Sequence, residues 1–317
     1  MRVVVRSLQA TAPIVARLRE LVGENVVVAN DDAELAASIG AAELLLISDN
    51  LFSAETARIL RERATSLKWI QLLSAGYDAV GRHGIPPGVI LTNAGAAFAP
   101  SVATQAIALL LGVERQIPAF LGSQKRHAWD RSPASRCAIP FDSAIAVIGF
   151  GHIGSEIGRI LRSFGARIIA VTRRGLPHPD ADESRPVVEL EAVLPHADAV
   201  VIALAAGPES RHLFGATQFS LMKRSAFLVN IARGYIVDCI ALADALKNGV
   251  IAGAGLDVTD PEPMPQHHPL WDAPNLIILP HMAGASGSVT ARRVAKVAGD
   301  NVARWLKGEK LAHIVAL

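Results

Sequence analysis

Several residue types are scarce in this sequence, and each shortage argues against a class of protein. Two cysteines, Cys137 and Cys239, occur among 317 residues, so they provide neither a disulfide framework nor a thiolate cage for a metal. Aromatic residues make up only 5% of the chain, which argues against a surface that stacks the bases of single strands. Basic and acidic residues nearly balance, with a net charge of +2, and this disfavours nucleic acid as a partner.

Long apolar runs are scarce too. The run 199–207 is among the longest, and it falls well below the ~18 residues that a membrane span needs. The opening MRVVVRSLQA turns polar too early for a signal sequence. The adjacent His267 and His268 have no partner at the spacing of metal ligands. We therefore expect a cytoplasmic protein that uses no metal and binds no membrane.

The residues that are abundant form the pattern of an α/β protein. Apolar residues make up 51% and charged residues 19%, which is enough for a large core, and the length suggests about two domains at ~150 residues each. Short β-branched or Leu-rich runs alternate with helix-patterned stretches, which predicts βαβ units and parallel sheets. The expected strands are 2–5, 26–28, 44–47, 69–72, 89–91, 144–149, 167–171, 199–204, 226–230, 254–256 and 276–279.

The order of these elements indicates where the domains meet. A long apolar helix is predicted at 102–113, between the two series of strands, and a final helix at 288–306 has no strand after it. We expect that this last helix folds back, so that one domain comprises residues 1–99 and 286–317 and the other comprises 100–285. The apolar helix is either a homodimer interface or an ordinary core helix.

A glycine pattern marks a dinucleotide-binding turn. Gly149, Gly151 and Gly154 form GxGxxG between a predicted strand and a predicted helix. In this context the first glycine permits a tight turn, the second lets the backbone approach a pyrophosphate, and the third lets the helix pack closely on the strand. The helix N-terminus then faces the anion.

The end of the next strand distinguishes between the two nicotinamide cofactors. An acid about 20 residues after the glycines would bind the ribose 2′-hydroxyl of NAD. Here that position holds Thr172, followed by Arg173 and Arg174. A hydroxyl and two guanidinium groups suit a 2′-phosphate, which a carboxylate would repel. We therefore expect NADP(H) to be preferred, without excluding NAD(H).

Reactive side chains follow three of the later strands. Arg233 follows one, the acids Asp257, Asp260 and Glu262 follow the next, and His281 follows the third. Ligands of an open parallel sheet lie beyond the carboxyl ends of its strands, so these side chains are expected to converge. A guanidinium suits a substrate carboxylate, and an imidazole transfers protons near neutral pH. The residues alone do not decide which acid accompanies the histidine.

Segments along nearly the whole chain match the pattern of one enzyme family. They are LLSAGYDAV, LTNAG, VIGFGHIG, ADAVVIALAAGPESRHLFG, MKRSAFLVNIARGYIVDCIALADAL, GAGLDVTDPEP and PLWDAPNLIILPHMAG. On these motifs the sequence resembles the D-isomer-specific 2-hydroxyacid dehydrogenases. The resemblance implies two doubly wound parallel-sheet domains, with a Rossmann cofactor domain inserted into a discontinuous flavodoxin-like substrate domain.

The resemblance also implies an activity and a set of site residues. It implies reversible hydride transfer between a nicotinamide cofactor and a small 2-keto or 2-hydroxy acid, such as glyoxylate or hydroxypyruvate, by a homodimer. The implied catalytic residues are Arg233, Glu262 and His281, and the implied substrate contacts are Ala75, Gly76, Arg233 and His281. The implied cofactor contacts are Gly149, Gly151, His152, Ile153, Gly154, Thr172, Arg173, Arg174, Ala232 and Asp257. The alternative is a nucleotide-sensing, corepressor-like binding protein of the same fold with little turnover.

Overall fold

The chain folds into two compact α/β units. A computed structural model describes residues 1–7, 11–205, 207–285 and 287–316. Unit 1 consists of Met1–Phe98 and Ala285–Leu317, and unit 2 consists of Ala99–Gly284. The boundaries expected from the sequence differ from this division by one residue, and what each unit binds stays a prediction.

Unit 1 is built on a parallel sheet with the strand order β2-β1-β3-β4-β5, which is the flavodoxin-type doubly wound order. Successive residues of a strand point to opposite faces: Val3 and Val5 join one apolar cluster, whereas Val4 joins the cluster on the other side. Both faces are therefore covered by helices. The elements are β1 Val3–Arg6, α1 Thr11–Val22, β2 Val26–Val28, α2 Asp32–Ser38, β3 Leu44–Ile47, α3 Ala54–Arg63, β4 Trp69–Leu72, α4 Asp78–His83, β5 Ile90–Thr92 and α11 Ser288–Leu306.

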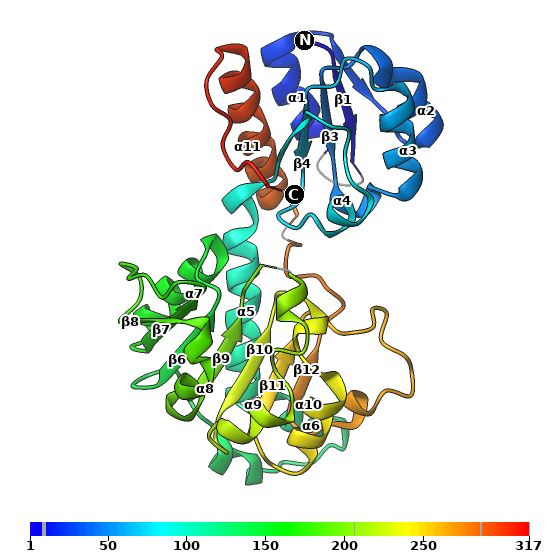
Figure 1. The fold of residues 1–317 in the computed structure, drawn as a ribbon. Coiled ribbons are helices and arrows are strands. Elements are labelled where there is room, and N and C mark those ends of the chain that lie inside the picture. Colours follow the sequence, from blue (N-terminus) through cyan, green and yellow to red (C-terminus); the bar gives the residue numbers. More distant parts are fainter. Residues whose placement is uncertain (8–10, 206, 286, 317) are drawn as a thin grey trace. The chain divides into compact units, whose positions relative to one another are not determined.

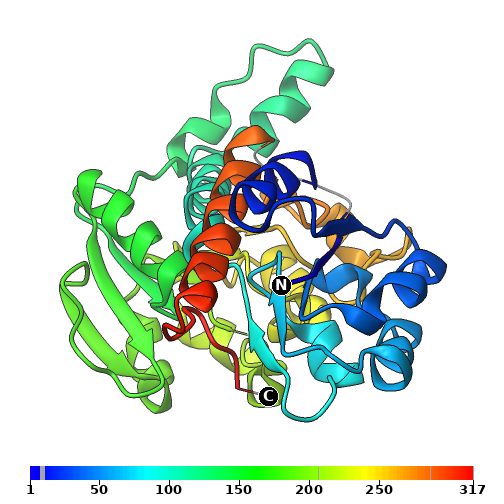
Figure 2. The same cartoon turned by 90° about the horizontal axis from the view of Figure 1, so that it is seen from above.

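Helix α11 comes from the far end of the chain, yet it completes the core of unit 1. It runs beside α1 in both views (Figures 1 and 2). Val294, Ala298 and Val302 share an apolar cluster with Val3 and Val5 of β1. The amphipathic pattern of 288–306 thus matches a helix that covers one face of a sheet.

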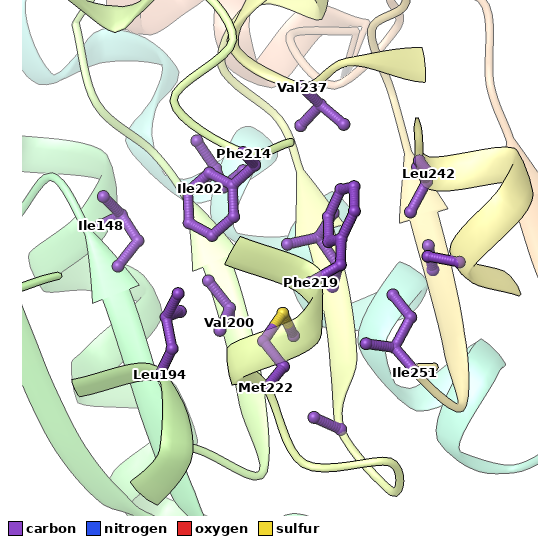
Figure 3. Close-up of a cluster of buried hydrophobic side chains, with 14 of the residues drawn as sticks. Ile148, Leu194, Val200, Ile202, Phe214, Phe219, Met222, Val237, Leu242 and Ile251 are labelled. Carbon is purple, nitrogen blue, oxygen red and sulfur yellow. The ribbon is translucent and has the colours of Figure 1, made fainter. Parts of the chain in front are cut away.

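Unit 2 is built on a parallel sheet with the order β12-β11-β10-β9-β6-β7-β8. This is the dinucleotide-binding order 3-2-1-4-5-6 with one further strand, and its switch point lies between β6 and β9. Apolar side chains fill the space between the sheet and its covering helices, as Figure 3 shows for Ile148, Ile202 and Phe219. The elements are α5 Ala99–Glu114, α6 Ile117–Lys125, β6 Ala144–Ile148, α7 His152–Ser163, β7 Arg167–Thr172, β8 Glu183–Pro186, α8 Leu190–Val193, β9 Ala199–Ile202, α9 Ala216–Leu221, β10 Phe227–Asn230, α10 Cys239–Lys247, β11 Gly253–Leu256 and β12 Leu276–Ile278.

The predicted fold class, two parallel-sheet α/β domains, is confirmed. One strand was missed: β8 reads ESRP and lies at the edge of its sheet, so it has neither the apolar run nor the alternation that marks a strand, and an edge tolerates its proline.

The expectation that no apolar stretch approaches the length of a membrane span is wrong for the region of helix α5. The helical stretch Gly95–Glu114 has a suitable length and a mean hydropathy of 1.7. In the structure α5 packs on β10 and β11, and its residues Val102, Ala106 and Leu110 are buried. Of the two interpretations of this helix, its contacts with β10 and β11 support the core helix, although only about 50% of the apolar stretch is buried.

Candidate active site

The glycine turn joins β6 to α7 in unit 2, at the switch point of the sheet. Gly149 has φ +92°, and a Cβ there would lie 2.4 Å from the Cα of Leu204, which follows β9. A Cβ on Gly154 would lie 2.0 Å from the carbonyl oxygen of Gly149. Both positions therefore exclude any side chain. A Cβ on Gly151 would meet nothing within 4 Å, so the backbone here is open to a ligand.

Helix α7 starts directly after this turn. Gly151 is its N-cap, His152 is its first residue, and Ile153 follows. The first NH groups of a helix have no partner within the helix, and they carry the positive end of its dipole. The turn thus presents a small open surface with a positive potential, which fits a dinucleotide pyrophosphate.

A pocket of about 600 Å³ lies at the end of β7. The Thr172 hydroxyl accepts a hydrogen bond from the NH of Gly175 at 2.9 Å. The side chain of Arg173 is 90% exposed and lies 4.0 Å from Glu209. Among the described residues that line the pocket, none is acidic. They are Phe150, Thr172, Arg173, Arg174, Leu176, Pro177 and His178.

The turn after β10 is shaped by a buried asparagine. Asn230, which is 0% exposed, donates from Nδ2 to the carbonyl of Arg233 at 2.9 Å and accepts at Oδ1 from the NH of Ala232 at 3.0 Å. Arg233 donates to the Ala232 carbonyl at 2.7 Å. A Cβ on Gly234 would lie 1.9 Å from the carbonyl oxygen of Thr259. The close approach at this glycine brings the arginine turn against the loop that carries the acids.

Glu262 and His281 form a hydrogen-bonded pair. Oε2 of Glu262 lies 2.9 Å from Nδ1 of His281, and Oε1 accepts from the NH of Thr259 at 3.0 Å. An ionised carboxylate only accepts hydrogen bonds, so the imidazole donates from Nδ1 and its Nε2 points elsewhere. Of the three acids that the sequence left open, the structure places Glu262 against the imidazole.

Asp257 fixes the turn that carries the histidine. It is 1% exposed, and its two carboxylate oxygens accept from the NH groups of Met282 and Ala283, each at 2.9 Å. Its carbonyl accepts from the NH of His281 at 2.7 Å. His281 itself has φ +53°, a strained backbone conformation for a residue with a side chain. Asp257 therefore holds His281 in a conformation that it would rarely adopt alone.

The surroundings of Glu262 and His281 shift the pKa of both side chains. The hydrogen bond that His281 donates to Glu262 raises the pKa of this histidine above its ordinary value, although burial and Arg233 oppose this. Burial works against ionisation of Glu262, but its hydrogen bonds with His281 and Thr259 still hold the pKa of this carboxyl below its ordinary value. A protonated imidazole beside an ionised carboxylate is the form that these groups favour.

The expected substrate contacts Ala75 and Gly76 belong to unit 1. They lie in the loop 74–77, which follows β4. The Ala75 carbonyl accepts from Nδ2 of Asn93, and the Gly76 carbonyl accepts from Oγ of Ser74, each at 2.9 Å. Within the described ranges, the NH groups of Ala75 and Gly76 donate no hydrogen bond to the protein. They are therefore available to an external acceptor.

Comparison with known proteins identifies the family. The model of the "D-isomer specific 2-hydroxyacid dehydrogenase, NAD binding domain" matches residues 107–283, which is more than half of the chain. The chain belongs to the D-isomer specific 2-hydroxyacid dehydrogenase family. Its members are oxidoreductases that use a nicotinamide cofactor on small 2-hydroxy or 2-keto acids, so the resemblance seen in the sequence is confirmed.

Individual relatives of this dehydrogenase carry different activities. It is 32% identical over 276 residues to the human glyoxylate reductase/hydroxypyruvate reductase, with 84% of this chain and 81% of that protein covered. It is 31% identical over 303 residues to the D-3-phosphoglycerate dehydrogenase of Methanocaldococcus jannaschii, with 94% and 56% covered. A crystal structure of a family protein from Aeromonas salmonicida superposes with a TM-score of 0.85 at 28% identity, covering 99% of both chains.

Two buried polar residues of this dehydrogenase escaped the sequence analysis. Asn230 was not singled out, and Asp257 was named only as a cofactor contact and as one of three open acids. Both side chains bind backbone groups of the turns that carry Arg233 and His281. Their position at the carboxyl ends of neighbouring strands was visible in the sequence, but their hydrogen-bond partners depend on the turns. In the part of the chain that the structure describes, no group of three His, Cys, Asp or Glu side chains forms a metal site.

Proposed function

We propose that this chain is an NADP(H)-preferring reductase of small 2-keto acids such as glyoxylate or hydroxypyruvate, acting reversibly. The observation that carries the proposal is the hydrogen-bonded Glu262–His281 pair, with Arg233 close enough to influence the pKa of both residues. This arrangement combines a proton donor with a cation that suits a carboxylate. The glycine turn and the pocket beyond β7, in the same unit, supply the features that a dinucleotide needs.

Each proposed catalytic residue has a role that its chemistry supports. A bound nicotinamide dinucleotide supplies the hydride. Arg233 binds the substrate carboxylate through its planar guanidinium. In unit 1, the NH groups of Ala75 and Gly76 are proposed as hydrogen-bond donors to a carboxylate. His281 donates a proton to the ketone oxygen in reduction and removes it in oxidation. Glu262 orients the imidazole and favours its protonated form.

The pocket beyond β7 supports the preference for NADP(H). Arg173 and Arg174 border it, and Thr172 occupies the position where an NAD-specific protein would place an acid. Gly149, Gly151 and Gly154 form the turn, and the remaining proposed cofactor contacts lie at the start of α7 or follow β10 and β11. These are His152, Ile153, Ala232 and Asp257.

A direct assay tests the proposal. The protein is incubated with NADPH and, in turn, with glyoxylate, hydroxypyruvate, pyruvate and phenylpyruvate, while NADPH absorbance is followed. We expect turnover with the small acids, and we expect His281→Ala to abolish most of it while NADPH still binds. Tight nucleotide binding with no turnover on any acid would instead support the corepressor-like alternative.

We further propose that the protein is a homodimer of the cytoplasm. Both cysteines are free thiols, which suits a reducing compartment. Helix α5 already packs on β10 and β11, so we propose that the interface uses other apolar side chains. The segment after it exposes Leu121 at 51%, Trp129 at 97% and Phe141 at 61%, and exposed apolar side chains of this size mark interaction surfaces. Light scattering on the purified protein tests the oligomeric state, and a monomeric mass would contradict the proposal.

A further inference from the structure

The loop 74–77 in unit 1 is held by its carbonyl groups. Asn93 donates from Nδ2 to the carbonyl of Ala75, and Ser74 donates from Oγ to the carbonyl of Gly76. A trans peptide unit is planar, and its NH points opposite to its carbonyl. The bond that fixes the Ala75 carbonyl therefore also fixes the direction of the Gly76 NH.

Asn93 makes hydrogen bonds with every polar group it has. Its Oδ1 accepts from the NH of Gly95 at 3.0 Å, and its own NH donates to the carbonyl of His313 at 3.1 Å. Its carbonyl accepts from Nε2 of Gln71 at 2.9 Å. A side chain tied at both ends in this way has one orientation available, because rotation would break several bonds at once.

A buried network anchors Asn93 to the core of unit 1. Gln71 and Asn301 are each 1% exposed, and Thr92 is 0% exposed. Oε1 of Gln71 accepts from Asn301 of α11 at 2.9 Å and from Thr92 at 2.8 Å. Buried polar networks whose members are all satisfied are rigid. The loop 74–77 is thus connected through Asn93 to the least mobile part of its unit.

We propose that Asn93 is a positioning residue for substrate binding: by holding the Ala75 carbonyl, it aims the Gly76 NH at the substrate carboxylate. The inference rests on the proposed function, in which this amide receives that carboxylate. A preset donor costs no reorganisation when the anion arrives. Loss of the preset direction weakens binding of the acid and leaves the nucleotide site in unit 2 intact.

Asn93→Asp tests this role selectively. The change keeps an acceptor for Gly95 but replaces the donor to Ala75 with an oxygen that repels the carbonyl. We expect KM for glyoxylate to rise roughly tenfold, with kcat changing less and the Kd of NADPH unchanged. Asn93→Ala removes both side-chain bonds without adding charge, and it should raise KM as well, which covers the case that the charged variant folds poorly.

The matched control is Asn25→Asp. Asn25 belongs to the same unit and donates to the carbonyl of Val22 at 3.2 Å. It precedes β2 and so lies at the amino ends of the parallel strands, whereas loop 74–77 follows β4 at their carboxyl ends. Its KM should stay at the wild-type value. A KM within about twofold of wild type in both folded Asn93 variants would overturn the proposal.

Hydrogen–deuterium exchange separates this inference from the proposed function. If the wild-type protein reduced none of the acids, the proposed function would fail, yet the positioning claim would still be decided by exchange of the Ala94 NH, which donates to the carbonyl of Ser74 in the same loop at 2.9 Å. We expect faster exchange there in Asn93→Asp than in wild type and in Asn25→Asp. Unchanged exchange would show that Asn93 does not hold the loop.

Discussion

Glu262 and His281 control each other's charge, and this makes the pH dependence of activity a test of their roles. The hydrogen bond that His281 donates to Glu262 raises the pKa of His281, so the imidazole keeps its proton to higher pH. In Glu262→Gln the amide oxygen carries no charge, and the pKa of His281 should fall. Reduction needs the protonated imidazole, so the alkaline limb of the pH profile for reduction should move to lower pH. Oxidation needs the neutral imidazole, so the acid limb of the pH profile for oxidation should also move to lower pH.

Profiles of kcat/KM against pH in both directions measure these limbs. Glu191→Gln is a suitable control, because Glu191 is an exposed acid of unit 2 whose carboxylate, among the described residues, bonds to the side chain of Gln218. Its profiles should match those of the wild type. Unmoved limbs in Glu262→Gln would show that the carboxylate does not set the protonation of His281.

The ionisation of Glu114 should make the stability of the protein, not its catalysis, depend on pH. It is 2% exposed, and its Oε2 has no hydrogen-bond partner in the part of the chain that the structure describes. Burial raises the pKa of Glu114 to about 7. Between its unfolded pKa and this value only the folded state holds the proton, so stability falls as pH rises through that interval. The full loss is about 3 kcal/mol at ~1.4 kcal/mol per pKa unit.

Glu114→Gln should remove this pH dependence, because an amide does not ionise. Urea unfolding at pH 5 and pH 8 measures the pH dependence of stability. From pH 5 to pH 8, the free energy of unfolding should fall much more in the wild type than in the variant. Equal losses would show that Glu114 is not the group responsible.

At the scale of elements, our proposal assigns the choice of nucleotide to the loop after β7. Each guanidinium that pairs with a 2′-phosphate contributes about 1.5–3 kcal/mol, so Arg173→Ala with Arg174→Ala should raise the Kd of NADPH by at least tenfold and change that of NADH little. Fluorescence titration measures both constants. Arg185→Ala, in the neighbouring strand β8 and paired with Glu183, should change neither. An unaltered ratio of the two constants would contradict the assignment.

Elements with strong apolar patterns were predictable from the sequence, and those without were not. Helix α11 was predicted at the residues where the structure has it, because its amphipathic repeat is long and regular. Strand β8 was missed because its pairing with β7 is backbone hydrogen bonding, to which the polar side chains of ESRP give no signal.

The candidate site was predictable in its residue types but not in its supports. The strand ends showed where Arg233 and His281 would lie, since chemistry gathers beyond the carboxyl ends of parallel strands. The contact between Glu262 and His281 spans 19 residues that contain several prolines and the short strand β12, and no periodicity predicts the path of such a segment. The hydrogen bonds of Asn230, Asp257 and Asn93 go to backbone groups, which any sequence supplies, so the sequence carries no mark of them.

At the scale of the whole molecule, the two units should respond separately to a change in one core. Val302 of α11 is 0% exposed and packs in the core of unit 1. Val302→Ala should lower the free energy of unfolding of unit 1 by about 2 kcal/mol, while the Kd of NADPH stays unchanged. Calorimetry measures the stability of unit 1, and fluorescence titration measures the Kd of NADPH. Lys296→Ala, on the same helix with a side chain 74% exposed, should alter neither, and a loss of NADPH binding in Val302→Ala would contradict this separation.

The placement of α11 also sets an order for folding during synthesis. The ribosome releases β1 to β5 first, and then all of unit 2, before residues 288–306 emerge. Until then, one face of the first sheet lacks the helix that covers Val3 and Val5. Unit 2, although second in the chain, is therefore the first whose residues are all available, and the nascent N-terminal sheet is the part of this protein that most needs a chaperone.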